Sequence, residues 1–355
     1  MLPIDSKIIS LLRFPMIVGI VMIHSGITLQ NDVSDYYLYN HLVVKGIIGT
    51  LTRLCVPLFF FISGYLFWAN NTFNLSVYLR KLKKRVSSLL IPYIFYCTLA
   101  IILFAILNFL KPEIQKGPTP SIKDWNFYVI LSMYWNMGDN LPIVPQFWFI
   151  RNLMVFILFA PIIYKLIKTF NTYPIFILGI LWIINIGEFD IPGTMCLFWA
   201  SLGGYFAIKN ISISETIQKI KLLGYFYPLL AIIDIITKGA RVNIYIHNLG
   251  IFLGVIFLWY ISVRFLLNHP KYSPNKLLLS STFFVFAMHE PYAGKIKTIL
   301  WKMLPDLSIN NNIADIQLIF YYFLWVTIWI AFLVLMFSII KIIFPKLATF
   351  LSGGR

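Results

Sequence analysis

Long apolar runs most strongly limit what this chain can fold into. A segment of about 20 mostly apolar residues is long enough to cross the hydrocarbon core of a bilayer as a helix. The sequence is 59% hydrophobic and 12% charged, whereas soluble domains have roughly 45–50% apolar and 25% charged residues. It therefore predicts an all-α, polytopic integral membrane protein with about ten transmembrane helices. The expected spans are residues 8–29, 43–68, 87–110, 144–167, 173–187, 192–208, 222–237, 244–267, 277–294 and 315–344.

The distribution of basic residues predicts the orientation of these spans. The run "RKLKKR", Arg80–Arg85, lies between the second and third spans, and short loops rich in Lys and Arg stay in the cytoplasm. With ten spans, both termini are then cytoplasmic, and the inner segments hold roughly twice as many Lys and Arg as the outer loops. We expect a multi-pass protein of a bacterial cytoplasmic membrane. The net charge of +16 reflects this topology, and no nucleic-acid-binding motif accompanies it.

The rest of the chain suggests one membrane domain over residues 1–355, with no appended soluble domain. The segment 111–143 is the longest outside the spans and includes the aromatic run "WNFYVILSMYW", so we expect an interfacial lid on the outer face. The histidines and cysteines lack metal-ligand spacing, so no metal is expected. The sequence does not specify an oligomeric state.

The first span carries two ionisable residues, Arg13 and His24. Their spacing is close to three helical turns, which places both on one helix face about 16 Å apart along the axis. Charged side chains within a bilayer usually face a protein interior or a water-filled cavity and mark function. The alternative is that Arg13 extends to lipid phosphates and His24 is a hydrogen-bonded core histidine.

Further ionisable residues are expected at the depth of His24, near the outer surface. They come from the second, fourth and ninth spans, and their convergence favours a catalytic site. The alternative is that one of the arginines pairs with the glutamate and braces the bundle. The residues are Arg53, Arg151, His289 and Glu290.

The inner side shows a complementary cluster of cations. Guanidinium groups pair bidentately with phosphate, so a multiply phosphorylated ligand would suit it. Anionic lipid headgroups are the alternative for the loop between the second and third spans. The cluster comprises Arg13, Arg80, Lys81, Lys83, Lys84, Arg85 and Arg264.

Four stretches resemble the membrane-bound acyltransferase 3 family, whose members transfer acyl groups, often acetyl, onto sugars of bacterial surface glycans. They are Arg13 with His24, "RLCVPLFFFISGYLF" from Arg53, "FWFIRNLMVF" before Ala160, and "HEP" from His289. The resemblance covers nearly the full chain and implies that His24 is the catalytic residue and that Arg13 supports activity. It also places the family's second-span motif on Arg53 and on Ser63 to Tyr65, and we assign Ser63 and Tyr65 to donor binding.

The resemblance implies a reaction between cytoplasmic acetyl-CoA, or another acyl-CoA, and a lipid-linked or surface polysaccharide. His24 would act as general base or form a covalent acyl-histidine. Arg53 or Arg151 would stabilise the oxyanion, and His289 or Glu290 would orient His24 or hold the sugar. Without a hydrolase-like domain, the chain would acylate its acceptor directly. The alternative from another class is a transporter or flippase for an anionic or lipid-linked glycan.

Overall fold

The protein is built from helices. We describe a computed structural model that covers residues 3–26, 36–69, 73–110, 122–137, 141–188, 191–290, 296 and 311–354, and no strand occurs within these ranges. The α-helices are α1 (Pro3–His24), α2 (Tyr37–Tyr39), α3 (Cys55–Trp68), α4 (Leu75–Arg85), α5 (Ile91–Leu110), α6 (Phe127–Trp135), α7 (Trp148–Leu158), α8 (Ala160–Phe170), α9 (Tyr173–Ile183), α10 (Thr194–Ile208), α11 (Ile213–Lys219), α12 (Lys221–Gly224), α13 (Tyr227–Ile236), α14 (Asn243–Asn268), α15 (Lys276–Met288), α17 (Asn311–Ile343) and α18 (Pro345–Leu351).

Several short helical turns of other types join these helices. Two π-helical segments and two 3-10 turns lie next to the regions considered below. They are η2 (Asn40–Ile48), η3 (Leu51–Leu54), η4 (Val86–Leu90) and η7 (Pro145–Phe147). The run from α2 to α3 thus passes through a π-helical and a 3-10 segment, so residue spacing there does not follow a single α-helical period.

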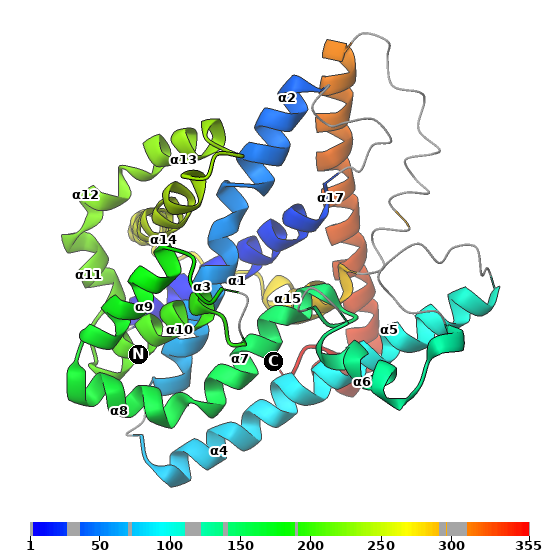
Figure 1. Ribbon diagram of the computed structural model, residues 1–355, viewed down its shortest axis with the longest axis horizontal. Helices are drawn as coiled ribbons and strands as arrows, with labels where there is room; N and C mark the ends of the chain where they lie inside the picture. Colours follow the sequence, from blue (N-terminus) through cyan, green and yellow to red (C-terminus); the bar gives the residue numbers. More distant parts are fainter. Residues whose placement is uncertain are drawn as a thin grey trace.

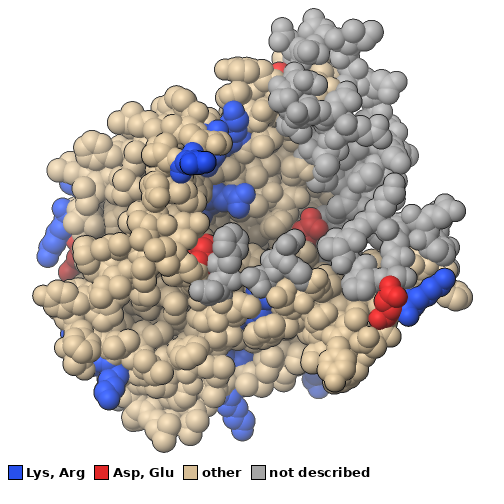
Figure 2. Space-filling view, in the orientation of Figure 1, with Lys and Arg blue, Asp and Glu red and all other residues tan. Residues whose placement is uncertain are grey.

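In the part of the chain that the structure describes, five helical segments are long and apolar enough to cross a membrane. A sixth is obtained if α7 and α8, which are bent by 62° at their junction, form one broken span. Large areas of the surface in Figure 2 carry no charged residue, as expected for a lipid-facing protein. The five segments are Ile4–His24, Tyr37–Trp68, Leu75–Phe109, Asn243–Asn268 and Ile313–Ile343.

The other predicted spans are shorter helices, so ten complete spans are not confirmed. The helices α9, α10 and α15 have 11, 15 and 13 residues, and α13 has 10. At 1.5 Å per residue each is shorter than the roughly 30 Å hydrocarbon core. Both ends of the described chain lie in the lower half of Figure 1, where α4 also lies. The cytoplasmic location of both termini stays a prediction.

Helix α1 lies inside the bundle and packs against α3, α14, α15 and α17. Its first turn is fixed by Asp5, a fully buried carboxylate that accepts hydrogen bonds from the backbone N–H groups of Ile213 and Ser214 and from the Ser214 hydroxyl. At the other end, the Tyr322 hydroxyl of α17 donates to the carbonyl oxygen of Met22 at 3.0 Å. Both ends of the helix that carries Arg13 and His24 are therefore held by distant parts of the chain.

Glycines allow α3 and α10 to pack in close contact. A methyl group added at Gly64 would overlap the carbonyl oxygen of Ala200, and one at Gly203 would overlap the carbonyl oxygen of Phe61. Small residues at helix interfaces let backbones approach closely in membrane proteins. Gly64, which lies in the Ser63 to Tyr65 stretch, thus serves helix packing.

Candidate active site

One face of α1 connects the two ionisable residues of the first span. Ile17 and Ile20 lie between Arg13 and His24 at positions that repeat every three or four residues, so the four side chains form a line along the helix. Arg13 lines a large pocket, and the two isoleucines line a smaller cavity. His24 contacts His289 beyond them. The helix therefore joins three regions of the candidate site.

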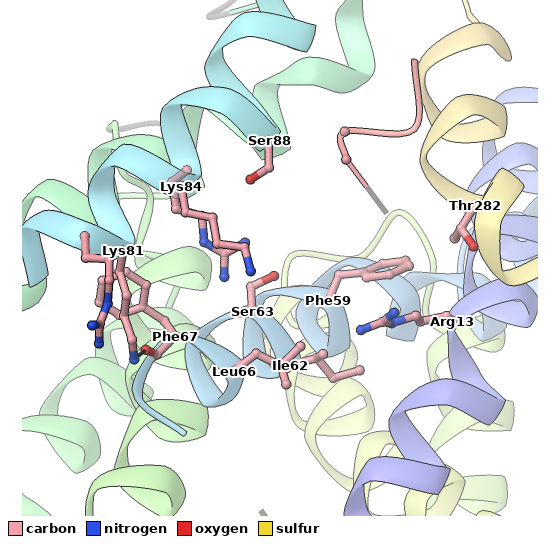
Figure 3. Close-up of a pocket in the computed structure, with 14 residues that line it drawn as sticks. Arg13, Phe59, Ile62, Ser63, Leu66, Phe67, Lys81, Lys84, Ser88 and Thr282 are labelled. Carbon is pink, nitrogen blue, oxygen red and sulfur yellow. Dashed lines mark hydrogen bonds between the residues drawn. The ribbon is translucent and has the colours of Figure 1, made fainter. Parts of the chain in front are cut away.

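The large pocket has a volume of about 570 Å³ and lies between α1, α3, α4, α15 and the turn after α18. Figure 3 shows Lys81 and Lys84 on α4 facing Arg13 on α1 across the pocket, with Ser63 of α3 between them. Five of the lining residues are cations, and the described lining includes no Asp or Glu. The lining residues are Arg13, Phe59, Ile62, Ser63, Leu66, Phe67, Arg80, Lys81, Lys84, Arg85, Ser88, Thr282, Gly353 and Gly354.

Local sequence explains how α4 presents its cations to this pocket. The Asn74 side chain accepts a hydrogen bond from the backbone N–H of Val77 and caps the start of α4. The last turn is basic, which suits the negative end of the helix dipole. The Lys81 ammonium group donates to the carbonyl oxygen of Phe67 and lies 5.4 Å from the centre of its ring. The amphipathic helix thus lies against the end of α3 with four of its five basic side chains at the pocket.

The smaller cavity extends from the pocket along α1. Its volume is about 70 Å³, and it shares Phe59, Ser63, Arg85 and Thr282 with the pocket. Its remaining lining is apolar and comes from α1, α7, α15 and η4. These residues are Ile17, Ile20, Leu89, Phe149, Ile150, Leu153, Phe283 and Phe286. Phe286 and Ile20 precede His289 and His24 by about one helical turn, so the cavity ends near the two histidines.

The two histidines lie against each other. The ring centres of His24 and His289 are 5.2 Å apart, and His289 is 1% exposed. Nδ1 of His289 lies 2.7 Å from the carbonyl oxygen of Phe286. Since a carbonyl only accepts, this nitrogen carries the hydrogen. Nε2 of His289 is buried and has no hydrogen-bond partner among the described residues. It is therefore a hydrogen-bond acceptor, on a residue that lies one helical turn beyond Phe286 of the cavity lining.

Gln146, in η7, holds the chain around His289 and was not predicted from the sequence. Its side-chain amide donates to the carbonyl oxygens of Phe286, Ala287 and Glu290, at 3.3, 3.1 and 2.7 Å. The last carbonyls of a helix have no partner within the helix, and Gln146 supplies one at the end of α15. The signal that the sequence offered for this residue was a single polar amide side chain in the otherwise apolar stretch "VPQFWFI".

The predicted arginines of the outer level line neither cavity. Arg151 is 1% exposed, and its guanidinium donates to the carbonyl oxygen of Trp135 and lies 5.5 Å from the centre of that residue's ring. It thus contacts α6, which belongs to the predicted outer lid. Arg53 is exposed, and its Nε donates to the carbonyl oxygen of Ile48 at 3.0 Å. Glu290 is partly buried, and its backbone carbonyl accepts from Gln146.

Three of the predicted donor-binding residues also lie outside the pocket lining. Tyr65 is 4% exposed and belongs to the core. Lys83 is exposed on α4, and Arg264 is exposed on α14. The pocket brings together the other six, which come from α1, α3 and α4: Arg13, Ser63, Arg80, Lys81, Lys84 and Arg85.

A family model described as an acyltransferase domain matches residues 7–344. The chain belongs to the acyltransferase 3 family. This match covers α1 from residue 7, the pocket lining except Gly353 and Gly354, and both histidines, and it supports a multi-pass membrane acyltransferase that uses an acyl donor and an acceptor. No curated protein and no solved structure matches the chain. Within the described residues, no group of three or more His, Cys, Asp or Glu side chains is placed to hold a metal ion.

Proposed function

We propose that this acyltransferase 3 family member transfers an acyl group, most simply acetyl, from cytoplasmic acyl-CoA to a hydroxyl group of a lipid-linked or surface glycan. One observation carries the proposal: a single face of α1 connects a pocket lined by five cations to a pair of histidines, of which His24 is partly buried and His289 is fully buried. The donor is polyanionic at one end and carries its reactive thioester at the other. The cationic pocket suits the polyanionic end of the donor, and the histidines suit the reactive thioester.

The cationic pocket is the proposed site for the phosphates of coenzyme A. Arg13 and Arg85 present guanidinium groups, which pair bidentately with phosphate oxygens, while Lys84 adds a compact positive charge. The apolar residues of α3, such as Phe59 and Leu66, would cover the uncharged parts of the donor. The predicted cytoplasmic position of α4 agrees with a donor that is made in the cytoplasm.

The smaller cavity is the proposed path for the pantetheine arm. Ser63 and Thr282 lie at the junction of the two cavities and offer hydroxyl groups to the amides of the arm. Beyond them the walls are apolar. The cavity measures only about 70 Å³, so side chains such as Phe59 and Phe286 have to rotate when the donor enters. The thioester would then arrive beside His24.

The proposed reaction uses His24 as general base. A sugar hydroxyl oxygen attacks the thioester carbonyl carbon while His24 accepts the hydroxyl proton. The carbon–sulfur bond then breaks, and the departing thiolate takes up that proton. His289 is the proposed positioning residue, because its ring lies against that of His24 and its Nε2 acceptor would stabilise the imidazolium that forms. An acyl-histidine on His24 remains the alternative route.

Arg53, Arg151 and Glu290 remain proposed contributors outside the cavities. Arg151 directly follows Ile150, which lines the smaller cavity, so a small movement of α7 would bring its guanidinium toward a developing oxyanion. Glu290 directly follows His289 and is suited to hold a sugar hydroxyl. Arg53 is exposed on η3, and its proposed role is to contact an anionic acceptor.

Transfer of label from acetyl-CoA tests the proposal. The protein is reconstituted in liposomes with radiolabelled acetyl-CoA and a lipid-linked glycan, and wild type is compared with His24→Ala. We expect the loss of a general base to reduce transfer by about 100- to 10,000-fold. His269→Ala, at an exposed histidine beyond the end of α14, serves as the matched control and should retain full activity.

Two results would contradict the proposal. Equal transfer by wild type and His24→Ala would remove His24 as the base. Absence of acyl-CoA binding, together with movement of the intact glycan lipid across the bilayer, would favour a transporter or flippase.

A further inference from the structure

An apolar groove lies beside the site, between α1, α15 and α17. Its volume is about 560 Å³. The groove is lined on one side by Phe14 and Val18 of α1, on another by Leu277 and Leu278 of α15, and along its length by α17. The α17 residues in the lining are Val326, Thr327, Ile330, Ala331, Val334, Leu335 and Ser338.

The dimensions of the groove match one leaflet of a bilayer. Val326 and Ser338 are twelve positions apart on α17, which corresponds to about 18 Å at 1.5 Å per residue. Half of a hydrocarbon core is roughly 15 Å. The groove therefore has the length of one lipid chain that enters from one surface of the membrane.

Two lysines stand at one end of the groove. Lys341 lies one turn beyond Ser338 on α17, and its ammonium group donates to the Ser280 hydroxyl of α15 at 3.1 Å. Lys276 directly precedes Leu277 and lies one turn before Ser280, so both lysines reach the same end. Both are exposed, and neither forms an ion pair with another described residue. An apolar channel that ends at two cations matches a hydrocarbon chain with an anionic headgroup.

We propose that this groove binds an anionic phospholipid, with one acyl chain between α1, α15 and α17 and the headgroup phosphate at Lys276 and Lys341. Each basic residue near an anionic headgroup adds about 1 kcal/mol of attraction. The bound lipid also covers Phe14 and Val18, which adjoin the face of α1 that carries Arg13 and Ile17. The lipid is therefore a structural ligand of the helix at the candidate site.

Photo-crosslinking with lipid analogues tests this inference. The protein is placed in nanodiscs of phosphatidylcholine that contain a trace of phosphatidylglycerol with a diazirine in its acyl chain. Labelled peptides are then identified by mass spectrometry. We expect labelling at α1, α15 and α17, with the neutral phosphatidylcholine analogue labelling these peptides much more weakly. Competition by unlabelled phosphatidylglycerol should remove the signal.

Three variants separate the two parts of the groove. Lys276→Gln/Lys341→Gln should weaken competition by unlabelled phosphatidylglycerol by roughly 30-fold, whereas Lys165→Gln/Lys168→Gln, at exposed lysines of α8, should leave it unchanged. Val334→Trp should block entry of the acyl chain and abolish groove labelling, while a thermal unfolding measurement should show that the variant is still folded. Equal labelling by the neutral analogue, wild-type competition in the Lys276 and Lys341 variant, or unchanged labelling in Val334→Trp would overturn the proposal.

Discussion

The imidazole rings of His24 and His289 lie 5.2 Å apart between their centres and are inclined by 51°. They come from α1 and from the residue that follows α15, elements far apart in the sequence. Because the Phe286 carbonyl holds the hydrogen on Nδ1 of His289, the other nitrogen of that ring is an acceptor. The two rings cannot both be protonated without strong repulsion, so the pair is suited to hold a single transferred proton.

Substitution of His289 should therefore distinguish a positioning role from a packing role. His289→Asn keeps a donor for the Phe286 carbonyl but loses the Nε2 acceptor, whereas His289→Gln places an amide oxygen near the Nε2 position. A hydrogen bond to a charged group contributes about 1.5–3 kcal/mol, so we expect kcat to fall roughly 10- to 100-fold in His289→Asn. His289→Gln should recover much of this loss, with KM for acetyl-CoA unchanged in both.

Equal kcat values for these two variants would show that His289 only fills space. The pH dependence of kcat gives an independent readout, because a residue that holds the transferred proton affects the profile and a packing residue does not.

The cations at the pocket should determine affinity for the donor. Lys84→Gln/Arg85→Gln removes two charges from the lining and is expected to raise KM for acetyl-CoA roughly tenfold or more, with kcat little changed. Lys83→Gln is the matched control, since Lys83 is a neighbour on the same helix that does not line the pocket. Acetyl-pantetheine, which lacks the nucleotide phosphates, should be used equally well by the wild type and the double variant.

These kinetics also test the competing assignment to lipid headgroups. If the double variant and Lys83→Gln raise KM equally, the cluster acts as a general cationic surface and the pocket has no specific role in binding the donor.

Ser63 marks the junction of the two cavities and provides a test of the path between them. Ser63→Leu should obstruct the passage of the pantetheine arm and reduce kcat/KM for acetyl-CoA by more than tenfold, because overpacking of a filled site displaces its neighbours. Ser63→Ala removes only the hydroxyl and should lose about threefold to tenfold. Similar activities of the two variants, measured at equal protein stability, would place the path elsewhere.

Regular helical spacing made part of this site predictable. Arg13 and His24 lie on one uninterrupted α-helix, so the period of 3.6 residues placed them on a common face. The cationic run Arg80–Arg85 was equally evident from its composition, although the structure places it in helix α4 and not in the predicted loop. The same rule separates Ser63 from Tyr65, because side chains two positions apart on a helix are rotated by about 200° and point to nearly opposite faces. Ser63 reaches the pocket, and Tyr65 is buried in the core.

The remaining parts depended on geometry that the sequence does not reveal. Arg53 was placed at the depth of His24 by counting along a continuous span, yet it lies in η3 beyond the π-helical η2. The prediction of ten spans rested on apolar length, whereas α9, α10 and α15 stop after 11 to 15 residues. Gln146 acts on carbonyls of a helix distant in sequence, and no local pattern links the two.

The contact between α3 and α10 gives a prediction about stability. Gly64→Ala and Gly203→Ala each place a methyl group against the backbone of the facing helix, and a backbone cannot rotate away as a side chain can. Each change should therefore destabilise the protein by about 1–3 kcal/mol or more. Gly250→Ala is the matched control on α14, since an added methyl group there meets no heavy atom within 4 Å. It should be neutral or stabilising by up to about 1 kcal/mol, because alanine favours a helix over glycine. Thermal unfolding in detergent measures all three, and wild-type stability of Gly64→Ala would mean that α3 and α10 do not pack this closely.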